Sequence, residues 1–200
     1  MNRESRRIAA WGVAIVLDLT CAIACGGGGG GGKSFTIVAM FQESGTAPAP
    51  DLVRLAGTTA GDLVVLDVNI GGPTSNDDLF AFAFDIALDD ESVVELVQGS
   101  AVAGSALKPG GMEQLEVLAA QNGNRITVGV TKLGPTPSGN GIPTGEQTVV
   151  TLQLRLLRKG ASSHLRLVGS YAMPPAAIDS TGEIIPSVQF DAQPALVAGS

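Results

Sequence analysis

The most constraining feature of this 200-residue sequence is a regular alternation of bulky apolar side chains with small or polar ones. The clearest run is LFAFAFDIAL, residues 79–88, in which every second side chain is large. Successive side chains of a β-strand point to opposite faces, whereas a helix would spread the same pattern around its surface. We therefore predict that one set is buried (Phe80, Phe82, Phe84, Ile86 and Leu88) and that the other set faces outward (Ala81, Ala83, Asp85 and Ala87).

The same alternation recurs between clusters of Gly, Pro, Asn and Asp, which are typical of turns. It predicts strands over residues 35–41, 62–70, 79–88, 93–97, 114–120, 125–132, 147–158, 163–168 and 187–191. Their apolar members are the rest of the expected core: Val64, Leu66, Val68, Ile70, Ile126, Val128, Val130, Val150, Leu152, Leu154 and Leu156. Many short strands with almost no helical periodicity predict an all-β, two-sheet sandwich of about nine strands.

One hairpin is marked by its turn. Asn122 and Gly123 lie between two apolar runs and supply residues that accept the positive φ of a tight turn. Residues 114–120 and 125–132 should therefore pair antiparallel. The segment MEQLEVLAA, which leads into this turn, also suits two helical turns, but we favour a strand because the hairpin needs a partner.

The N-terminus has the layout of a secretory signal. Arg3, Arg6 and Arg7 precede an apolar run over residues 8–17, and small residues follow that run. A run of this length is well short of the roughly 20 residues that a membrane-spanning helix needs. We predict a signal peptide over residues 1–24, and any lasting membrane attachment then requires a lipid or a partner.

The residues Ala22-Ile23-Ala24-Cys25 resemble a bacterial lipobox, in which small residues precede a lipid-modified cysteine. The resemblance implies a diacylglyceryl group on Cys25 and, because Gly26 replaces the Asp that retains many lipoproteins in the inner membrane, display on the outer membrane or cell surface. The alternative is an ordinary signal peptide that leaves a free protein. Residues 25–34, which contain seven consecutive glycines, are expected to act as a tether.

The net charge and the positions of the cysteines argue against several classes of function. The chain has 19 acidic against 12 basic side chains, so phosphate backbones would be repelled and we expect no nucleic-acid partner. Both cysteines precede the predicted domain, which therefore has no disulfide and no cysteine-based metal site. The glycine run before Lys33 and Ser34 superficially matches a phosphate-binding loop, but it lacks the preceding strand and following helix. We expect no cofactor.

The order of segments resembles the cohesin modules, a family of jelly-roll sandwiches. The resemblance lies in Gly61-Asp62 before LVVLDVNI, then AFAFDIALDDESVVELVQG, NRITVGV, GEQTVVTLQLRLL and finally DSTGEIIPSVQF. It covers residues 35–192, which we take as the domain, with residues 193–200 as a C-terminal tail. Cohesins bind dockerins, which are small calcium-containing helical modules, through the flat face of one sheet. The resemblance thus implies a non-catalytic module with a dockerin-like or other secreted protein partner, in the setting of polysaccharide-degrading assemblies.

A candidate binding face follows if the strands 79–88 and 125–132 lie in one sheet. The outward side chains would then form a flat surface of small residues, on which helices pack well: Ala81, Ala83, Asp85, Ala87, Thr127 and Gly129. The alternative interpretation is an ordinary solvated face of a sandwich. The loop of residues 133–147, rich in Pro and Gly, is either a rim of this face or a passive crossover.

Carbohydrate binding is a second hypothesis, because sandwiches of this kind also hold sugars. Sugar platforms need exposed aromatic rings. The single Trp, Trp11, lies in the predicted signal, Tyr171 is the one Tyr, and three phenylalanines are assigned to the core. The aromatic inventory therefore disfavours a polysaccharide-binding module.

An enzyme is the third and least supported hypothesis. His164, the single histidine, alternates outward in its strand, and the adjacent Ser162 and Ser163 belong to no nucleophile motif. We expect no catalytic residue. The acidic run Asp89-Asp90-Glu91 suggests calcium, but it lacks the spacing of a known calcium loop and is better explained as a turn, so we assign no metal site.

Overall fold

The computed structural model describes residues 36–134, 138–170 and 173–200. The predicted signal peptide, Cys25, the glycine tether and Tyr171 lie outside these residues. The described part of the chain contains no helix, and so none that is long and apolar enough to cross a membrane.

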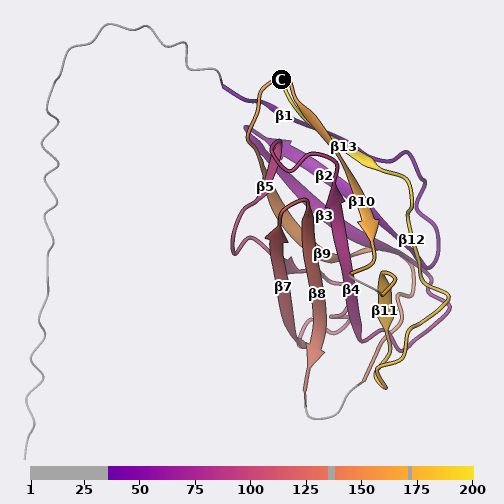
Figure 1. Ribbon diagram of the computed structural model, residues 1–200. Helices are drawn as coiled ribbons and strands as arrows, with labels where there is room; N and C mark the ends of the chain where they lie inside the picture. Colours follow the sequence, from indigo (N-terminus) through magenta and orange to yellow (C-terminus); the bar gives the residue numbers. More distant parts are fainter. Residues whose placement is uncertain (1–35, 135–137, 171–172) are drawn as a thin grey trace, which may run out of the picture. The chain divides into compact units, whose positions relative to one another are not determined.

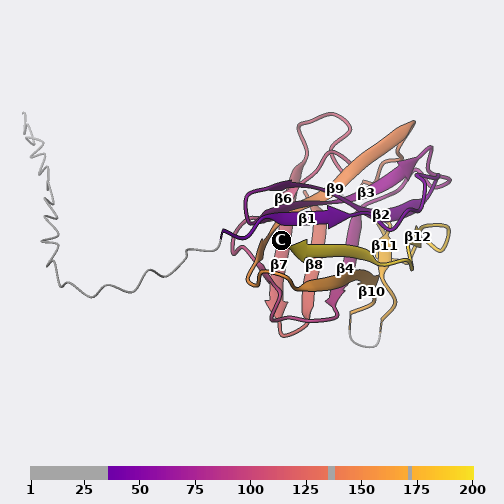
Figure 2. The same cartoon turned by 90° about the horizontal axis from the view of Figure 1, so that it is seen from above.

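The domain is a sandwich of two sheets, as predicted (Figure 1, Figure 2). Sheet A has the order β1 (Ala39–Gln42), β13 (Ala195–Gly199), β10 (Ser162–Val168), β4 (Ala81–Leu88), β8 (Arg125–Leu133) and β7 (Gln114–Asn122), with β11 (Ala176–Ile178) beside the start of β4. Sheet B has the order β12 (Gln189–Phe190), β2 (Leu52–Ala60), β3 (Leu63–Gly72), β9 (Gly145–Leu156) and β5 (Val94–Leu96), with β6 (Val102–Ala103) also beside β9. Every pairing is antiparallel except that of β12 with β2.

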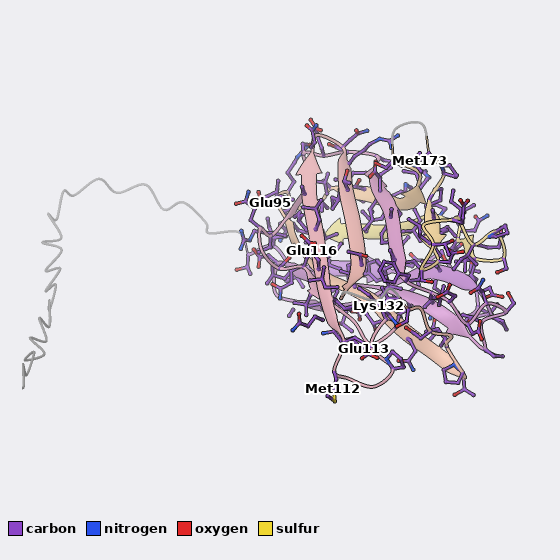
Figure 3. All side chains as sticks on the ribbon, turned by 90° about the horizontal axis from the view of Figure 1, so that it is seen from below. Glu95, Met112, Glu113, Glu116, Lys132 and Met173 are labelled. Atoms are coloured by element: carbon purple, nitrogen blue, oxygen red, sulfur yellow. The ribbon has the colours of Figure 1, made fainter. Side chains whose placement is uncertain are left out.

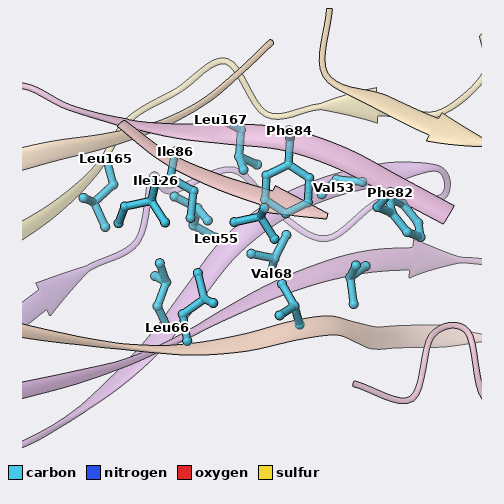
Figure 4. Close-up of a cluster of buried hydrophobic side chains, with 14 of the residues drawn as sticks. Val53, Leu55, Leu66, Val68, Phe82, Phe84, Ile86, Ile126, Leu165 and Leu167 are labelled. Carbon is cyan, nitrogen blue, oxygen red and sulfur yellow. The ribbon is translucent and has the colours of Figure 1, made fainter. Parts of the chain in front are cut away.

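The core is the one that the alternation predicts. Phe82, Phe84, Ile86 and Leu88 on β4 are almost fully buried, as are all the apolar positions predicted on β3, β8 and β9 (Figure 4). The ring of Phe84 lies 5.9 Å from that of Phe190 on β12, centroid to centroid, so aromatic packing joins the two sheets. Phe80 differs from the prediction. It precedes β4 and is only half-buried, whereas Leu79, held by a bridge to Asn140, takes the buried position.

Each predicted strand overlaps a strand of the structure, but four strands were not predicted: β2, β6, β11 and β13. The C-terminal residues 193–200 are not a tail, because β13 lies between β1 and β10 in sheet A and buries Ala195 and Val197 completely. The run ALVAG is short and consists mainly of small residues, so its alternation is too weak to distinguish it from a loop. The domain therefore extends to the end of the chain.

β13 also joins the beginning of the domain to its end. Ala39 on β1 pairs with Gly199 on β13, and the backbone groups of Val38 and Ser200 exchange two hydrogen bonds of 3.0 and 2.9 Å. Two segments that are far apart in the sequence thus form one continuous part of sheet A.

The predicted hairpin is present as β7 and β8, which excludes the helical alternative for residues 112–120. Its turn is displaced by one residue, since Asn122 is still paired with Arg125 and the turn consists of Gly123 and Asn124. Of these two residues, Gly123 has the positive φ, 59°. Two-residue hairpin turns require a positive φ, and glycine accepts it readily.

Candidate functional site

The six residues predicted to form a binding face do lie on one face of the molecule. β4 and β8 are neighbours in sheet A, with Ala83 opposite Gly129 and Asp85 opposite Thr127. Because Phe82, Phe84 and the alternate residues of β8 point into the core, these six positions face away from sheet B. We call this surface the docking face, defined by Ala81, Ala83, Asp85, Ala87, Thr127 and Gly129; β7, β8 and β4 lie side by side in Figure 1.

The centre of the docking face is flat. A Cβ atom placed on Gly129 would meet a single neighbour within 4 Å, the Cβ of Leu118 at 4.0 Å. Leu118, on β7, is opposite Gly129 and is 61% exposed. Analysis of the sequence missed Leu118, although a large apolar residue among the otherwise polar or small positions Glu116 and Ala120 was a usable signal.

Asp85 forms a recess in this flat surface. Its side chain points outward as predicted, but neighbouring groups bury it to 2% exposure. Its Oδ2 accepts a hydrogen bond of 3.1 Å from Nη1 of Arg125, and the same Nη1 donates to the carbonyl oxygen of Gly169 at 3.0 Å. The other carboxylate oxygen, Oδ1, has no partner among the described residues.

A cavity of about 330 Å³ opens beside this carboxylate, lined by Asp85, Asn122, Arg125 and Thr127. A buried carboxylate oxygen without a hydrogen bond is unfavourable and rare in folded proteins. The recess can therefore accept a hydrogen-bond donor from a bound molecule, and such a donor would satisfy Asp85 Oδ1.

An exposed ionic cluster borders the docking face at the end of β4. Asp89 accepts hydrogen bonds from the guanidinium of Arg166 and lies 2.9 Å from Nδ1 of His164. The Arg166 hydrogen bond, followed by that of His164, holds the pKa of the Asp89 carboxyl below its usual value. His164 thus belongs to a surface ion cluster. Ser163 points to the other face, where its hydroxyl oxygen accepts a hydrogen bond from the backbone N–H of Asp90, so the two residues form no catalytic pair.

Asp90, the next residue of this turn, forms local hydrogen bonds. Asp90 accepts hydrogen bonds from the backbone N–H and the hydroxyl of Ser92, at 2.9 and 2.6 Å, and these contacts lower the pKa of its carboxyl. This arrangement supports the interpretation of residues 89–91 as a turn. Among the described residues, no three His, Cys, Asp or Glu side chains gather where a metal ion could be held.

The loop after β8 is anchored to the segment before β4. The backbone N–H of Gly139 donates to Asp78 Oδ1 at 2.7 Å, and that of Ile142 donates to Thr74 Oγ1 at 2.9 Å. The described part of this loop therefore resembles a crossover from sheet A to sheet B more than a free rim.

Comparison with known proteins relates the fold to one group of solved structures. A type II cohesin domain from the cellulosome of Acetivibrio cellulolyticus is 15% identical, covers 72% of this chain and 92% of its own length, and has a TM-score of 0.51. The second type II cohesin module of a cellulosomal adaptor scaffoldin from the same organism is 13% identical, with 82% and 98% covered and a TM-score of 0.51. A type II cohesin from Bacteroides cellulosolvens is 13% identical, with 74% and 97% covered and a TM-score of 0.50.

At the level of sequence, no protein-family model matches the chain, and comparison with curated proteins gives no match either. The likeness is therefore one of fold: this chain has the cohesin-like, two-sheet jelly-roll architecture that its strand order suggested.

Proposed function

We propose that this cohesin-like domain is a non-catalytic module that binds a dockerin-like helical module, or another secreted protein module, on the docking face. The observation that carries the proposal is the open, small-residue surface of β4 and β8, set by the register of Ala83 with Gly129. The likeness in fold to the type II cohesins supports it.

The chemistry of the docking face suits a helix. Alanine, glycine and threonine residues let a helix approach the sheet closely, and close approach maximises van der Waals contact. Leu118 supplies an exposed apolar anchor at one side, and the Asp85 recess supplies an acceptor for a partner's N–H or O–H. A flat apolar centre with one unsatisfied polar group is the pattern of a binding surface with a specificity contact.

The main test is a pull-down with the purified chain, run against dockerin modules and, in parallel, against insoluble polysaccharides. Ala83→Arg and Thr127→Arg each place a long charged side chain on the docking face. Each should abolish capture of the protein partner while circular dichroism and thermal unfolding stay unchanged. Thr58→Arg, at an exposed position on the outer side of sheet B, is the matched control and should bind normally.

Undiminished binding by both docking-face variants would reject the proposed face. Retention on polysaccharide alone, with no protein captured, would favour the carbohydrate-binding alternative.

The recess makes a second, finer test. Asp85→Ala removes the acceptor but leaves the flat surface in place. A hydrogen bond to a charged group contributes about 1.5–3 kcal/mol, so the partner's Kd should rise about 10- to 100-fold. An unchanged Kd would show that no partner group enters the recess.

We also propose that the chain is exported and held by a lipid on Cys25, on the outer membrane or cell surface. The basic, apolar and small-residue order of the N-terminus supports this proposal. Metabolic labelling with a radioactive fatty acid should mark the parent protein and not the Cys25→Ser variant, which should appear in the soluble fraction. An unlabelled parent protein would mean that the signal is of the ordinary, non-lipidated kind.

A further inference from the structure

The edges of the two sheets are unequally protected. Sheet A ends in β1 and β7, and sheet B ends in β12 and β5. Three of these edge strands are short, with two to four residues each, whereas β7 has nine. Short edges offer little backbone for another strand to pair with, and proteins commonly use them to prevent unwanted association. β7 lacks this protection.

The backbone of β7 pairs with β8 and with no other strand of the described chain. Asn122 and Arg125 close a two-residue turn, so they form a hydrogen-bonded pair, and alternate residues of β7 bond to β8 from there. The remaining residues of β7 direct their N–H and C=O groups to the open side: Leu115, Val117, Ala119 and Gln121. The strand contains no Pro, Lys or break in register that would block a further strand.

The facing edge of sheet B is closed by a side chain. Gln121 on β7 reaches across to β5, where its Oε1 accepts a hydrogen bond of 2.6 Å from the backbone N–H of Leu96. Its Nε2 lies 3.4 Å from the carbonyl oxygen of Val94. This amide takes the place of a neighbouring strand for β5. Among the described residues, no side chain does the same for the open edge of β7.

A groove of about 830 Å³ runs between these two edges. Its walls include Ala119 and Gln121 from β7, and Glu91, Glu95 and Leu96 from the region of β5. Figure 3 shows Glu95, Glu116 and Glu113 along this flank. On the β7 side the groove touches Ala119, Ala120 and Gln121, and the unpaired edge of the strand continues from there back to Leu115.

The groove and the adjoining part of β7 together carry more acidic than basic side chains. Glu91, Glu95 and Arg155 line the groove, and Glu116 lies on β7 outside its lining. Neither Glu91 nor Glu116 forms an ion pair or hydrogen bond with the described residues, and Glu95 shares Arg155 with Asp62, at 3.2 and 3.7 Å. Lys132, on β8, is directed to the carbonyl oxygen of Ser138. A chain that enters the groove therefore meets unpaired carboxylates.

We propose that the open edge of β7 binds an extended, Lys- or Arg-bearing segment of a partner protein as an added strand of sheet A. Backbone groups of Leu115, Val117 and Ala119 supply the hydrogen bonds, and Glu91, Glu95 and Glu116 pair with the segment's cations. A second copy of this chain is a poorer occupant, because it would bring its own acidic groups to this edge and the chain has a net charge of −7. This site is separate from the docking face and goes beyond the function proposed above.

The test uses the full chain, labelled with ¹⁵N, and a synthetic ten-residue peptide in which Lys alternates with Val and Thr. Titration should protect the amides of Leu115, Val117 and Ala119 from hydrogen exchange, and affinity should fall as salt is added. A peptide with Glu in place of Lys should not bind. N-methylation of alternate amides in the Lys peptide removes the backbone N–H groups that would pair with β7. This peptide should bind at least 10-fold more weakly to the unaltered protein.

Variants of the protein complete the test. Glu91→Gln combined with Glu116→Gln should weaken binding of the Lys peptide several-fold, whereas Glu183→Gln, an exposed position in the turn after β11, should not. Equal binding of the N-methylated peptide, or protection confined to amides away from β7, would overturn the proposal. So would sedimentation of the free chain as a dimer whose β7 amides are already protected.

Discussion

The two outer faces of the sandwich differ in what they do with their polar groups. On sheet B, Arg54 bonds with both oxygens of Glu146, at 2.6 and 2.9 Å, and with Glu43 at 2.7 Å, while the hydroxyl of Thr151 donates to Asp67 at 2.5 Å. On the docking face of sheet A, small residues surround a single buried carboxylate that has one free oxygen. The charged groups on the outer face of sheet B bond mainly with one another, although Oδ1 of Asn69 on β3 is buried without a partner among the described residues. The docking face of sheet A has few such internal bonds and leaves a surface for another molecule.

This difference between the two outer faces suggests that sheet B contributes mainly to stability and sheet A mainly to binding. Side chains that bond within the outer face of sheet B hold β2, β9 and the β1–β2 connection together, so changes there should weaken the fold. Apart from Asp85, which pairs with Arg125, the side chains on the docking face form no ion pair within the described domain, so changes to them should spare the fold and weaken binding.

The largest expected effect is on sheet B. Arg54 is 8% exposed in its side chain, and its bonds with Glu146 and then with Glu43 raise the pKa of its guanidinium above the usual value. Breaking a fully buried pair costs about 3–5 kcal/mol. Since both glutamates keep contact with water, Arg54→Met should lower the free energy of unfolding by about 2–3 kcal/mol. Chemical denaturation measures this, and partner capture should be unchanged.

Arg155→Met is the control for that prediction. Arg155 is also on sheet B and also forms ion pairs, but its side chain is 45% exposed, so the loss should be within about 1 kcal/mol. Equal losses for the two variants would mean that the burial of Arg54 is not what makes its ion pairs important.

The next effect is on sheet A and concerns binding. Leu118→Ala removes the exposed anchor of the docking face. Truncation of an interface residue that is well packed in the complex costs about 1–2 kcal/mol, so the partner's Kd should rise about 10-fold. The free energy of unfolding should change by less than about 0.5 kcal/mol. Calorimetric titration and denaturation of the same variant would show whether binding and stability separate as expected.

A smaller effect is expected from Thr151→Val on sheet B. This change keeps the shape of the side chain but removes the hydroxyl that donates to Asp67. The net contribution of such a hydrogen bond is about 1 kcal/mol, and the free energy of unfolding should fall by that amount. A double-mutant cycle with Asp67→Ala would isolate the interaction, and no coupling between the two changes would contradict it.

The smallest effect is the pH dependence of the ionic cluster beside the docking face. The pKa of Asp89 is lower in the folded state than in the unfolded state, chiefly because of Arg166, so Asp89 stabilises the fold at neutral pH. This contribution should disappear as the pH falls through the usual aspartate value of about 4 and then through the lower folded-state pKa. Asp89→Asn should therefore be less stable than the parent at pH 7 and equal to it in strong acid. Glu91→Gln, in the same turn but at a residue without an ion pair among the described residues, is the control and should be as stable as the parent at pH 7.

The sequence predicts the core well and the finer parts of the site poorly. Burial of the β4 residues Phe82, Phe84 and Ile86 depends on local alternation, which can be read directly. The position of β13 depends on pairing with β1 and β10, and the burial of Asp85 depends on Arg125 from the adjacent strand and on Gly169. These contacts join residues far apart in the chain, and local pattern contains no information about them.

The same limit explains β2. Val53 and Leu55 point inward on that strand, but the next two inward positions are Gly57 and Thr59, so only its first half shows the apolar alternation of the other long strands. The placement of the docking face was predictable because both of its strands alternate clearly. The open edge of β7 was not predictable from the sequence, because local pattern does not show which strands lack a neighbour on one side.

The pairing of β1 with β13 makes the domain almost a closed ring of chain, with Val38 and Ser200 in direct hydrogen-bond contact. The start and the end of such a ring are interchangeable in principle. A circular permutant that joins these residues through a short glycine linker and opens the chain at Gly160, in the exposed turn between β9 and β10, should fold to the same sandwich. In this permutant the chain would begin and end at Gly160, so any tether would leave the sandwich from the turn between β9 and β10. Comparing its partner binding with that of the parent would test whether the position of the tether matters.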